Sequence, residues 1–189
     1  EDVALEAKLE QARTTFEPEV DWLRADLGAS EALDIPRALA SFHVYRTYID
    51  PDVGEVDGFD RQAVSEAQLP MELASILLLE ERGRDAFVIR FQQTTPPVIA
   101  KGVEDTAFYR YNRLLCLNEV GGDPGRFSIA VDDFHAGNLE RARRFPNALL
   151  TTQTHDTKRS GDMRARLVAL TWLADEWRDH VLEWRRVNE

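Results

Sequence analysis

The spacing of apolar residues along the first half of the chain predicts a series of short amphipathic helices. Ala4, Leu5, Leu9, Ala12 and Phe16 recur mainly at intervals of three and four residues, so they share one face of a first helix. Further helices are expected over residues 18–28, 36–40, 61–68, 71–81 and 85–93. This pattern indicates a mainly α chain.

Two stretches are expected to be extended and to supply a few short strands. Residues 42–49 (FHVYRTYI) are rich in β-branched and aromatic side chains, which favour an extended backbone. Residues 148–152 (ALLTT) form a second apolar, β-prone run. Between them, residues 50–60 are rich in Asp, Gly and Pro and are expected to form a surface loop. The spacing of these acids does not match a calcium-binding loop, so we expect no calcium there.

The second half of the chain is also expected to be helical, after an interruption at two prolines. Pro96 and Pro97 disfavour the α-conformation in the residues before them, so we expect a break there and a new helix over residues 103–117. Later helices are predicted over residues 131–145, 160–172 and 175–187, with the following side chains facing a core: Phe134, Leu139, Ala142, Trp177, Val181 and Trp184. We therefore expect one mostly helical domain over residues 1–189. Its helical part reaches about residue 93, and the site segments and closing helices follow from about residue 94.

Composition and charge narrow the possible classes of function. The chain has 189 residues, of which 43% are hydrophobic, and this length suffices for a domain with a core. The net charge of −11 argues against nucleic acid, whose phosphates require a basic surface. We expect no membrane span, because no apolar run is long enough to cross a bilayer. Cys116 is the only cysteine, so the chain has no internal disulfide and we expect a cytoplasmic protein. The four histidines lack the spacing of a zinc site, so we expect no metal. We also expect no cofactor.

A stripe of polar residues marks the helix predicted over residues 103–117. Asp105, Tyr109 and Asn112 are spaced to align on one helical face, and Lys101 lies near its start. Hydrogen-bonding groups with an aromatic ring among them suit a sugar, which offers hydroxyls and flat apolar ring faces. A helix face that is solvated or packed against neighbours fits the same pattern equally well.

A second candidate site follows the β-prone run at residues 148–152. His155 and Asp156 lie in a polar loop after this run and before a predicted helix, where α/β barrels place catalytic groups. Lys158 and Arg159 would keep the Asp156 carboxylate ionised if they fold near it. From the local pattern alone, the simpler interpretation is that Asp156 caps the next helix.

Two long segments of this chain resemble one enzyme family, in the same order along the sequence. THDTKRSGDMRAR at residues 154–166 is similar to the last signature segment of the maltooligosyl trehalose synthases, in the α-amylase superfamily. AKGVEDTAFYRYNRLLCLNEVGGDP at residues 100–124 resembles a second segment of that family. The resemblance implies a mainly helical fragment of the later part of a (β/α)8 barrel and its helical insertion. Since the first residue is not Met and residues 1–12 read as the inside of a helix, we expect a piece of a longer enzyme.

The resemblance implies a rearrangement of the reducing-end α-1,4 linkage of a maltooligosaccharide into an α,α-1,1 linkage. A nucleophile and a general acid would serve this reaction, and both would lie outside this chain, in the remainder of the barrel. Asp156 matches the third carboxylate of the superfamily, which stabilises the transition state, and His155 would bind the same sugar. The residues implied in substrate binding are Lys101, Glu104, Asp105, Tyr109, Arg110, Tyr111, Asn112, Lys158 and Arg159. No pattern around Glu119 supports a catalytic role for it.

Two other functions stay open at this point. An α-amylase-type hydrolase would share the superfamily carboxylates but release a free reducing sugar. A helical interaction module would explain the acidity and the amphipathic helices, although not the two sugar-enzyme segments. If the chain is a piece of a synthase, we expect it to be inactive by itself.

Overall fold

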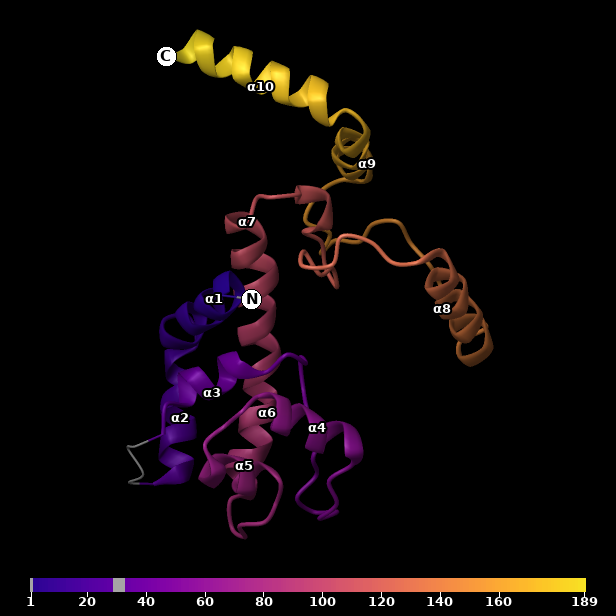
Figure 1. The fold of residues 1–189 in the computed structure, drawn as a ribbon. Helices are drawn as coiled ribbons and strands as arrows, with labels where there is room; N and C mark the ends of the chain where they lie inside the picture. Colours follow the sequence, from indigo (N-terminus) through magenta and orange to yellow (C-terminus); the bar gives the residue numbers. More distant parts are fainter. Residues whose placement is uncertain (1, 29–32) are drawn as a thin grey trace. The chain divides into compact units, whose positions relative to one another are not determined.

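The computed structural model describes residues 2–28 and 33–189, and their regular structure is almost entirely helical (Figure 1). This confirms the mainly α prediction. The chain divides into two compact units, Glu1–Tyr111 and Asn112–Glu189. The only β pairing among the described residues is an isolated antiparallel bridge between Asp50 and Glu55. The strand-like segment predicted at residues 42–49 forms no strand: the backbone bends at residues 43–45, and the N–H groups of Tyr48 and Ile49 donate to the side chains of Asp60 and Gln92 instead of to a neighbouring strand.

The helices of the first unit match the predicted positions up to residue 93. They are α1 (Asp2–Arg13), α2 (Glu17–Leu27), α3 (Ile35–Ser41), α4 (Gly58–Glu66), α5 (Met71–Leu77), α6 (Asp85–Ile99), the π-helix η1 (Ala100–Ala107) and α7 (Phe108–Arg110). Local signals fix several ends. Asp34 and Asp57 accept hydrogen bonds from backbone N–H groups in the first turns of α3 and α4. Gly28 ends α2 with a positive φ of 73°, a conformation that glycine adopts without strain.

The hydrophobic core of the first unit lies around α6. Phe87 and Phe91 on this helix are fully buried, and their rings are 5.6 Å apart. Phe42, from the segment after α3, packs against Phe91 with its ring at 61°, a favourable edge-to-face geometry. Residues of α2, α3 and α5 complete the same cluster. The first unit therefore has a core of its own, against which η1 and its side chains are held.

The predicted break at Pro96 and Pro97 is wrong, because α6 continues through both prolines to Ile99. It runs on into η1 and α7, so that the three form one helical rod (Figure 1). A proline inside a helix leaves one carbonyl without its usual N–H donor. Here the carbonyl of Gln92, four residues before Pro96, accepts a hydrogen bond from the Thr95 hydroxyl at 3.3 Å. The side chain thus replaces the missing backbone donor.

The helix predicted over residues 103–117 is also wrong in its second half. The rod ends at Arg110, the backbone is extended at Tyr111 and Leu114, and only a 3-10 turn, η2 (Leu115–Leu117), follows. The leucines after residue 113 have helical spacing, but Tyr111 and Asn112 are weak helix formers that do not extend the rod. Asn112 consequently lies outside the helix and in the other unit, so it does not join Asp105 and Tyr109 on one helical face.

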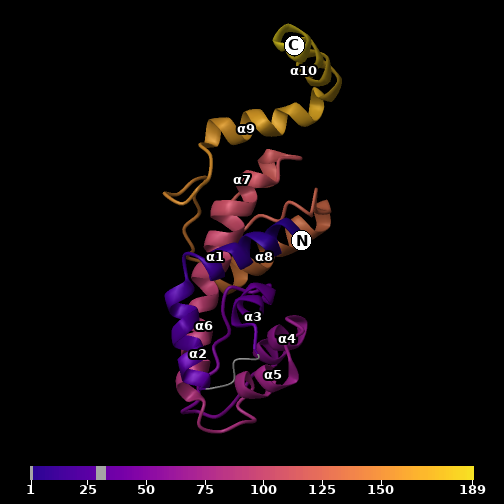
Figure 2. The ribbon, with the colours of Figure 1, turned by 90° about the vertical axis from the view of Figure 1, so that its left-hand side faces the viewer.

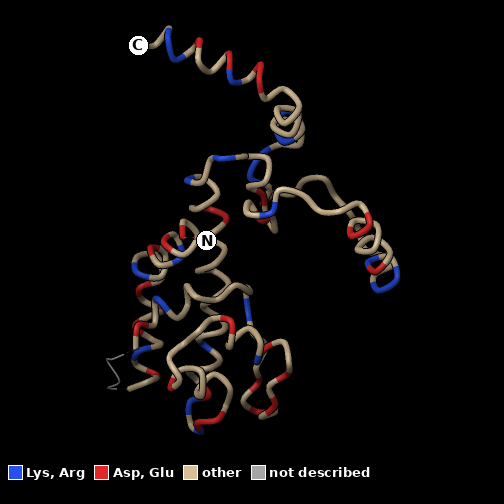
Figure 3. The backbone as a smooth tube through the Cα atoms, viewed as in Figure 1, with Lys and Arg blue, Asp and Glu red and all other residues tan. Residues whose placement is uncertain are grey.

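The second unit contains the later helices at the predicted places. They are α8 (Val131–Arg144), α9 (Gly161–Ala169), the 3-10 turn η3 (Leu170–Trp172) and α10 (Ala174–Asn188). Figure 2 shows α9 and α10 as successive helices separated by a short connection. Figure 3 shows both acidic and basic residues along α10. None of the helices in the described residues combines the length and apolar character needed to cross a membrane.

The prediction that side chains of α8 and α10 face a core is wrong within this chain. Asn118 is the only buried residue among those described in the second unit. Phe134 and Leu139 on α8 are exposed. On α10 the rings of Trp177 and Trp184 meet edge-to-face with centroids 5.5 Å apart, His180 stacks on Trp184 at 6.1 Å, and both tryptophans stay exposed. Helical periodicity identifies the apolar face of a helix, but it does not show whether another element packs against that face. Within the second unit, no element buries the apolar faces of α8 and α10. The β-prone run at residues 148–152 likewise forms no strand.

Candidate functional site

The predicted site residues divide between the two units, and the structure places each group locally. The first unit contains Lys101, Glu104, Asp105, Tyr109, Arg110 and Tyr111, on η1, on α7 and directly after it. The second contains Asn112, His155, Asp156, Lys158 and Arg159. Each group is described by itself below.

A close helix contact fixes the position of η1 in the first unit. Gly102 lies so near α1 that a Cβ atom on it would stand 2.6 Å from the Cα of Lys8. Only glycine permits this approach of two backbones. The side chains on the remaining faces of η1 are thereby held in place relative to α1.

Ion pairs order the exposed site residues of the first unit. Lys101 and Asp105, one helical turn apart, form an ion pair of 2.5 Å. Arg110 donates two hydrogen bonds, of 2.7 and 3.0 Å, to the carboxylate of Glu10 on α1. The hydrogen bond from Arg110 lowers the pKa of Glu10, so this pair stays charged. Arg110 therefore anchors α7 to α1, and half-exposed Tyr109 lies directly before it.

Glu104 is the one predicted site residue that is buried in the first unit. Its Oε1 accepts a short hydrogen bond from the hydroxyl of Tyr45, which comes from the segment after α3. Burial and, next, the Glu104 carboxylate raise the pKa of the Tyr45 hydroxyl, so Tyr45 stays protonated and donates. Tyr45 was not predicted as a site residue, because its partner lies 59 residues away in the sequence.

Lys8 is a second residue near η1 that sequence reasoning missed. Only 6% of its surface is exposed, and its Nζ donates a 2.9 Å hydrogen bond to the carbonyl of Phe42. Burial lowers the pKa of Lys8 to about 8, because removal from water disfavours the charged ammonium. A signal existed in the sequence: Lys8 stands at helical spacing between Leu5 and Ala12, on the apolar face of α1.

In the second unit, His155 and Asp156 project from a tight turn. Thr157 Oγ1 donates to the Thr154 carbonyl at 2.6 Å, and the Asp156 N–H donates to Thr154 Oγ1 at 3.2 Å. The side chains of His155 and Asp156 are exposed, and His155 Nε2 lies 3.3 Å from Asp156 Oδ2. The helix that follows is capped by Ser160, whose hydroxyl accepts from the Met163 N–H. The alternative interpretation of Asp156 as the helix cap is therefore wrong.

The segment before this turn and the segment after it are tied to each other. The Gly161 N–H donates to the Gln153 side chain at 2.9 Å, and Arg164 donates to the Thr152 carbonyl at 2.8 Å. The turn with His155 and Asp156 is thus closed at its base into a loop, which we call the HD loop (residues 152–164).

Glu119 joins the HD loop to the other segment that resembles the synthases. Its Oε1 accepts hydrogen bonds from the N–H of Lys158 at 2.8 Å and of Val120 at 2.9 Å, and Arg164 Nε lies 3.7 Å from its Oε2. Arg159 donates to the carbonyl of the neighbouring Asn118 at 3.0 Å. Burial would raise the pKa of Glu119, but these hydrogen bonds outweigh it and lower the pKa, so the carboxylate is ionised.

The acidic segment of residues 50–60, which runs into the first turn of α4, contains no predicted site residue. Two of its carboxylates accept hydrogen bonds from backbone N–H groups: Asp50 from the N–H of Asp52, and Asp60 from the N–H of Tyr48 at 3.0 Å. In the described part of the chain, no group of three or more His, Cys, Asp or Glu is arranged to hold a metal ion.

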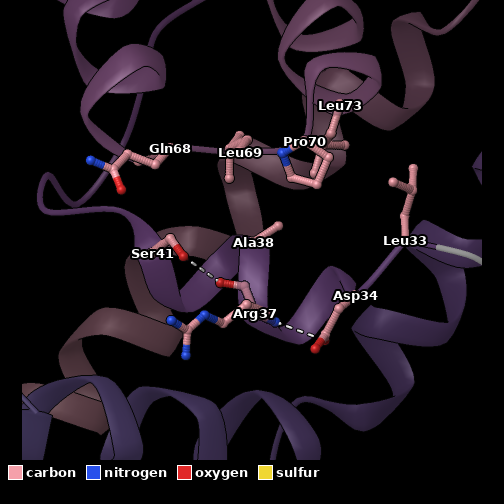
Figure 4. A pocket seen from close by; sticks show the side chains of 10 residues that line it. Leu33, Asp34, Arg37, Ala38, Ser41, Gln68, Leu69, Pro70 and Leu73 are labelled. Carbon is pink, nitrogen blue, oxygen red and sulfur yellow. Dashed lines mark hydrogen bonds between the residues drawn. The ribbon is translucent and has the colours of Figure 1, made fainter.

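A cavity of about 190 Å³ in the first unit also lies apart from the predicted site residues (Figure 4). It lies between α3 and the segment that leads into α5. Two of the polar side chains drawn in its lining are engaged in α3 itself: Asp34 accepts from the Arg37 N–H, and Ser41 donates to the Arg37 carbonyl. These contacts cap and complete a helix, so we assign no chemistry to this cavity.

Comparison with known proteins identifies relatives over nearly the whole chain. A putative maltooligosyl trehalose synthase of Mycobacterium tuberculosis (strain CDC 1551 / Oshkosh) is 44% identical over 110 residues, which are 58% of this chain and 14% of that protein. The solved maltooligosyltrehalose synthase from Arthrobacter ramosus is 38% identical, with a TM-score of 0.74 over 96% of this chain. The chain is homologous to part of the maltooligosyl trehalose synthases. No family model matches it.

The resemblance read from the two segments is thereby confirmed. The hypothetical maltooligosyl trehalose synthase of Sulfolobus tokodaii is 33% identical, with a TM-score of 0.82 over 98% of this chain. The chain spans 24% of the length of each of these two solved synthases. The names of the relatives indicate an enzyme, and the roles of the individual site residues stay predictions.

Proposed function

We propose that this chain forms the sugar-binding part of a maltooligosyl trehalose synthase, with Asp156 as its catalytic carboxylate. The observation that supports this most directly is that homology to solved synthases extends over 96% of the chain. The HD loop adds local support, because it exposes the carboxylate of Asp156 beside the ring of His155. Groups that contact a substrate must be exposed, whereas the helix-capping alternative would turn the carboxylate to the backbone.

In this proposal Asp156 acts on the sugar whose glycosidic bond is broken. Departure of the reducing-end glucose gives that sugar ring oxocarbenium character, and a nearby carboxylate stabilises the developing positive charge. His155, 3.3 Å from Asp156, binds the same ring and holds the carboxylate in place. The nucleophile and the general acid come from the remainder of the barrel. We therefore expect the chain alone to be inactive.

The exposed residues of η1 and α7 hold the displaced glucose in this proposal. Lys101 and Asp105 supply a charged donor and acceptor for hydroxyls, and the ring of Tyr109 offers a flat apolar face. Glu104 is buried and hydrogen-bonded to Tyr45, so it supports this surface from beneath. A glucose held here turns, and its anomeric hydroxyl attacks the anomeric carbon of the covalent glycosyl-enzyme. The α,α-1,1 bond forms as the ester bond to the nucleophile breaks, and the hydroxyl proton passes to the acid/base residue, so that the reaction is an isomerisation.

Product analysis tests this function. A complete synthase that contains this segment is incubated with a maltooligosaccharide, and trehalose-ended product is measured against free reducing sugar. We expect mainly the trehalose-ended product, and no reaction with the 189-residue chain alone. A complete enzyme that releases only reducing sugar would identify an amylase-type hydrolase instead.

A further inference from the structure

Glu119 holds the HD loop from one side at a point two residues from Asp156. The carboxylate accepts the Lys158 N–H at 2.8 Å, and its side chain is only 13% exposed. Within the loop, Gln153 is hydrogen-bonded to Gly161 and Thr154 to Thr157, and Arg159 donates outside the loop to the carbonyl of Asn118, the neighbour of Glu119, at 3.0 Å. The contacts of Gln153 and Thr154 fix the shape of the loop, whereas the hydrogen bonds to Asn118 and Glu119 fix its place in the second unit, and only the one to Glu119 is made by a side chain of that segment.

The same glutamate is fixed by its own surroundings. Its Oε1 also accepts the adjacent Val120 N–H at 2.9 Å, and Arg164 from α9 lies 3.7 Å from its other oxygen. Two N–H donors on one oxygen set the direction of the carboxylate, so Glu119 is a rigid acceptor. An ionised carboxylate that is already committed to these donors has no proton to give, which excludes a role as general acid.

We propose that Glu119 is a positioning residue for Asp156: by holding the Lys158 N–H, it sets the place of the HD loop and of its exposed carboxylate. This inference rests on the proposed function, since it assigns Glu119 to the reaction through Asp156. A misplacement of about 1 Å in a catalytic group can slow a reaction by about a hundredfold. The reaction depends on the position of the Asp156 carboxylate, and it does not require a charge on Glu119.

Reach and charge can be separated with three substitutions of Glu119 in a complete synthase that contains this segment. Glu119→Gln keeps the accepting oxygen at the same distance but removes the charge. Glu119→Asp keeps the charge but is one methylene too short to reach the Lys158 N–H. Glu119→Ala removes both. We expect Glu119→Gln to retain most of the kcat, and the Asp and Ala variants to lose about a hundredfold with little change in KM.

A double-mutant cycle with Asp156→Asn separates positioning from general support of the fold. If Glu119 acts through Asp156, Glu119→Asp lowers kcat in the normal enzyme but adds little once Asp156 has been replaced. Glu183→Ala, an exposed glutamate on α10, serves as the matched control and should leave kcat unchanged. The melting temperature of every variant is measured alongside kcat.

The outcomes distinguish failure of the catalytic assignment of Asp156 from failure of the positioning role of Glu119. If Asp156→Asn has normal kcat, the catalytic assignment itself fails, and the positioning role fails with it. If Asp156→Asn is slow but Glu119→Asp and Glu119→Ala are normal, only the positioning inference is overturned. It is also overturned if the Glu119 and Asp156 effects on kcat multiply, or if kcat follows charge so that Gln is slow and Asp is normal. Should Glu119→Ala fail to fold, the contrast between Gln and Asp still decides.

Discussion

Burial of Lys8 beneath η1 predicts an unusual dependence of stability on pH. Its pKa in the folded chain is about 8, against an ordinary value of 10.5. Below pH 8 both the folded and the unfolded chain hold the Lys8 proton, so no proton is exchanged on unfolding. Between pH 8 and 10.5 only the unfolded chain holds it, and the free energy of unfolding rises with pH. The gain is complete above pH 10.5.

The magnitude follows from the shift in pKa. Each pKa unit corresponds to about 1.36 kcal/mol, so a fall from 10.5 to about 8 gives a gain of about 3 kcal/mol over the whole window. Lys8→Met keeps the length of the side chain and removes the titrating group. The difference in unfolding free energy between the two proteins should therefore be constant below pH 8. Above pH 8, the free energy of unfolding of the unsubstituted chain should rise relative to that of the variant by up to about 1.4 kcal/mol per pH unit.

Urea unfolding at several pH values measures this difference. Trp22 lies in the first unit, with the guanidinium of Arg90 5.6 Å from its ring, and its fluorescence reports the unfolding of that unit. The tryptophans of the second unit, Trp172, Trp177 and Trp184, are replaced by phenylalanine in both proteins. Other titrating groups are shared and cancel in the comparison. A difference that does not change between pH 7.5 and 10 would refute the buried, deprotonating Lys8.

Three further predictions concern the rod and its exposed residues. Gly102→Ala should destabilise the first unit by about 1–3 kcal/mol in urea unfolding, since the new methyl group would meet Lys8 at 2.6 Å; an unchanged midpoint would contradict the close contact. Thr95→Val should cost about 1 kcal/mol by removing the hydroxyl that satisfies the Gln92 carbonyl, and a neutral result would show that the carbonyl does not need it. Lys101→Ala in a complete synthase should raise hydrolysis relative to isomerisation, because a loosely held glucose lets water compete. An unchanged product ratio in a stably folded variant would leave Lys101 a structural role only.

Local patterns in the sequence were sufficient for most of the helices. The ends of α2 and α3 follow from Gly28 and from the Asp34 cap, which act within one turn of the chain. The continuation through Pro96 was not predictable from the usual rule, since it depends on a particular hydroxyl, that of Thr95, lying beside one carbonyl. The helix predicted to reach residue 117 ends at Arg110. The leucines after residue 113 have helical spacing, but Tyr111 and Asn112, which precede them, are weak helix formers, and the spacing of apolar residues does not reveal this.

Local pattern located the two candidate segments but left their roles open, the resemblance supplied those roles, and the residues that support the segments were missed. Tyr45 and Glu104 are 59 residues apart, and Glu119 and Lys158 are 39 residues apart. Contacts at such separations leave no periodic signal in one sequence. The apolar faces of α8 and α10 were recognised correctly as faces, but whether they are buried depends on what packs against them, which no local pattern contains.

Turnover by Asp156→Asn tests the central claim most directly. The substitution keeps the size of the side chain but removes the charge that would stabilise the oxocarbenium-like transition state. In a complete synthase that contains this segment, we expect kcat to fall by at least about a hundredfold, with KM little changed. Because Asp156 is exposed and Ser160 caps the next helix, the melting temperature should stay nearly the same. Near-normal turnover of this variant would contradict the catalytic assignment.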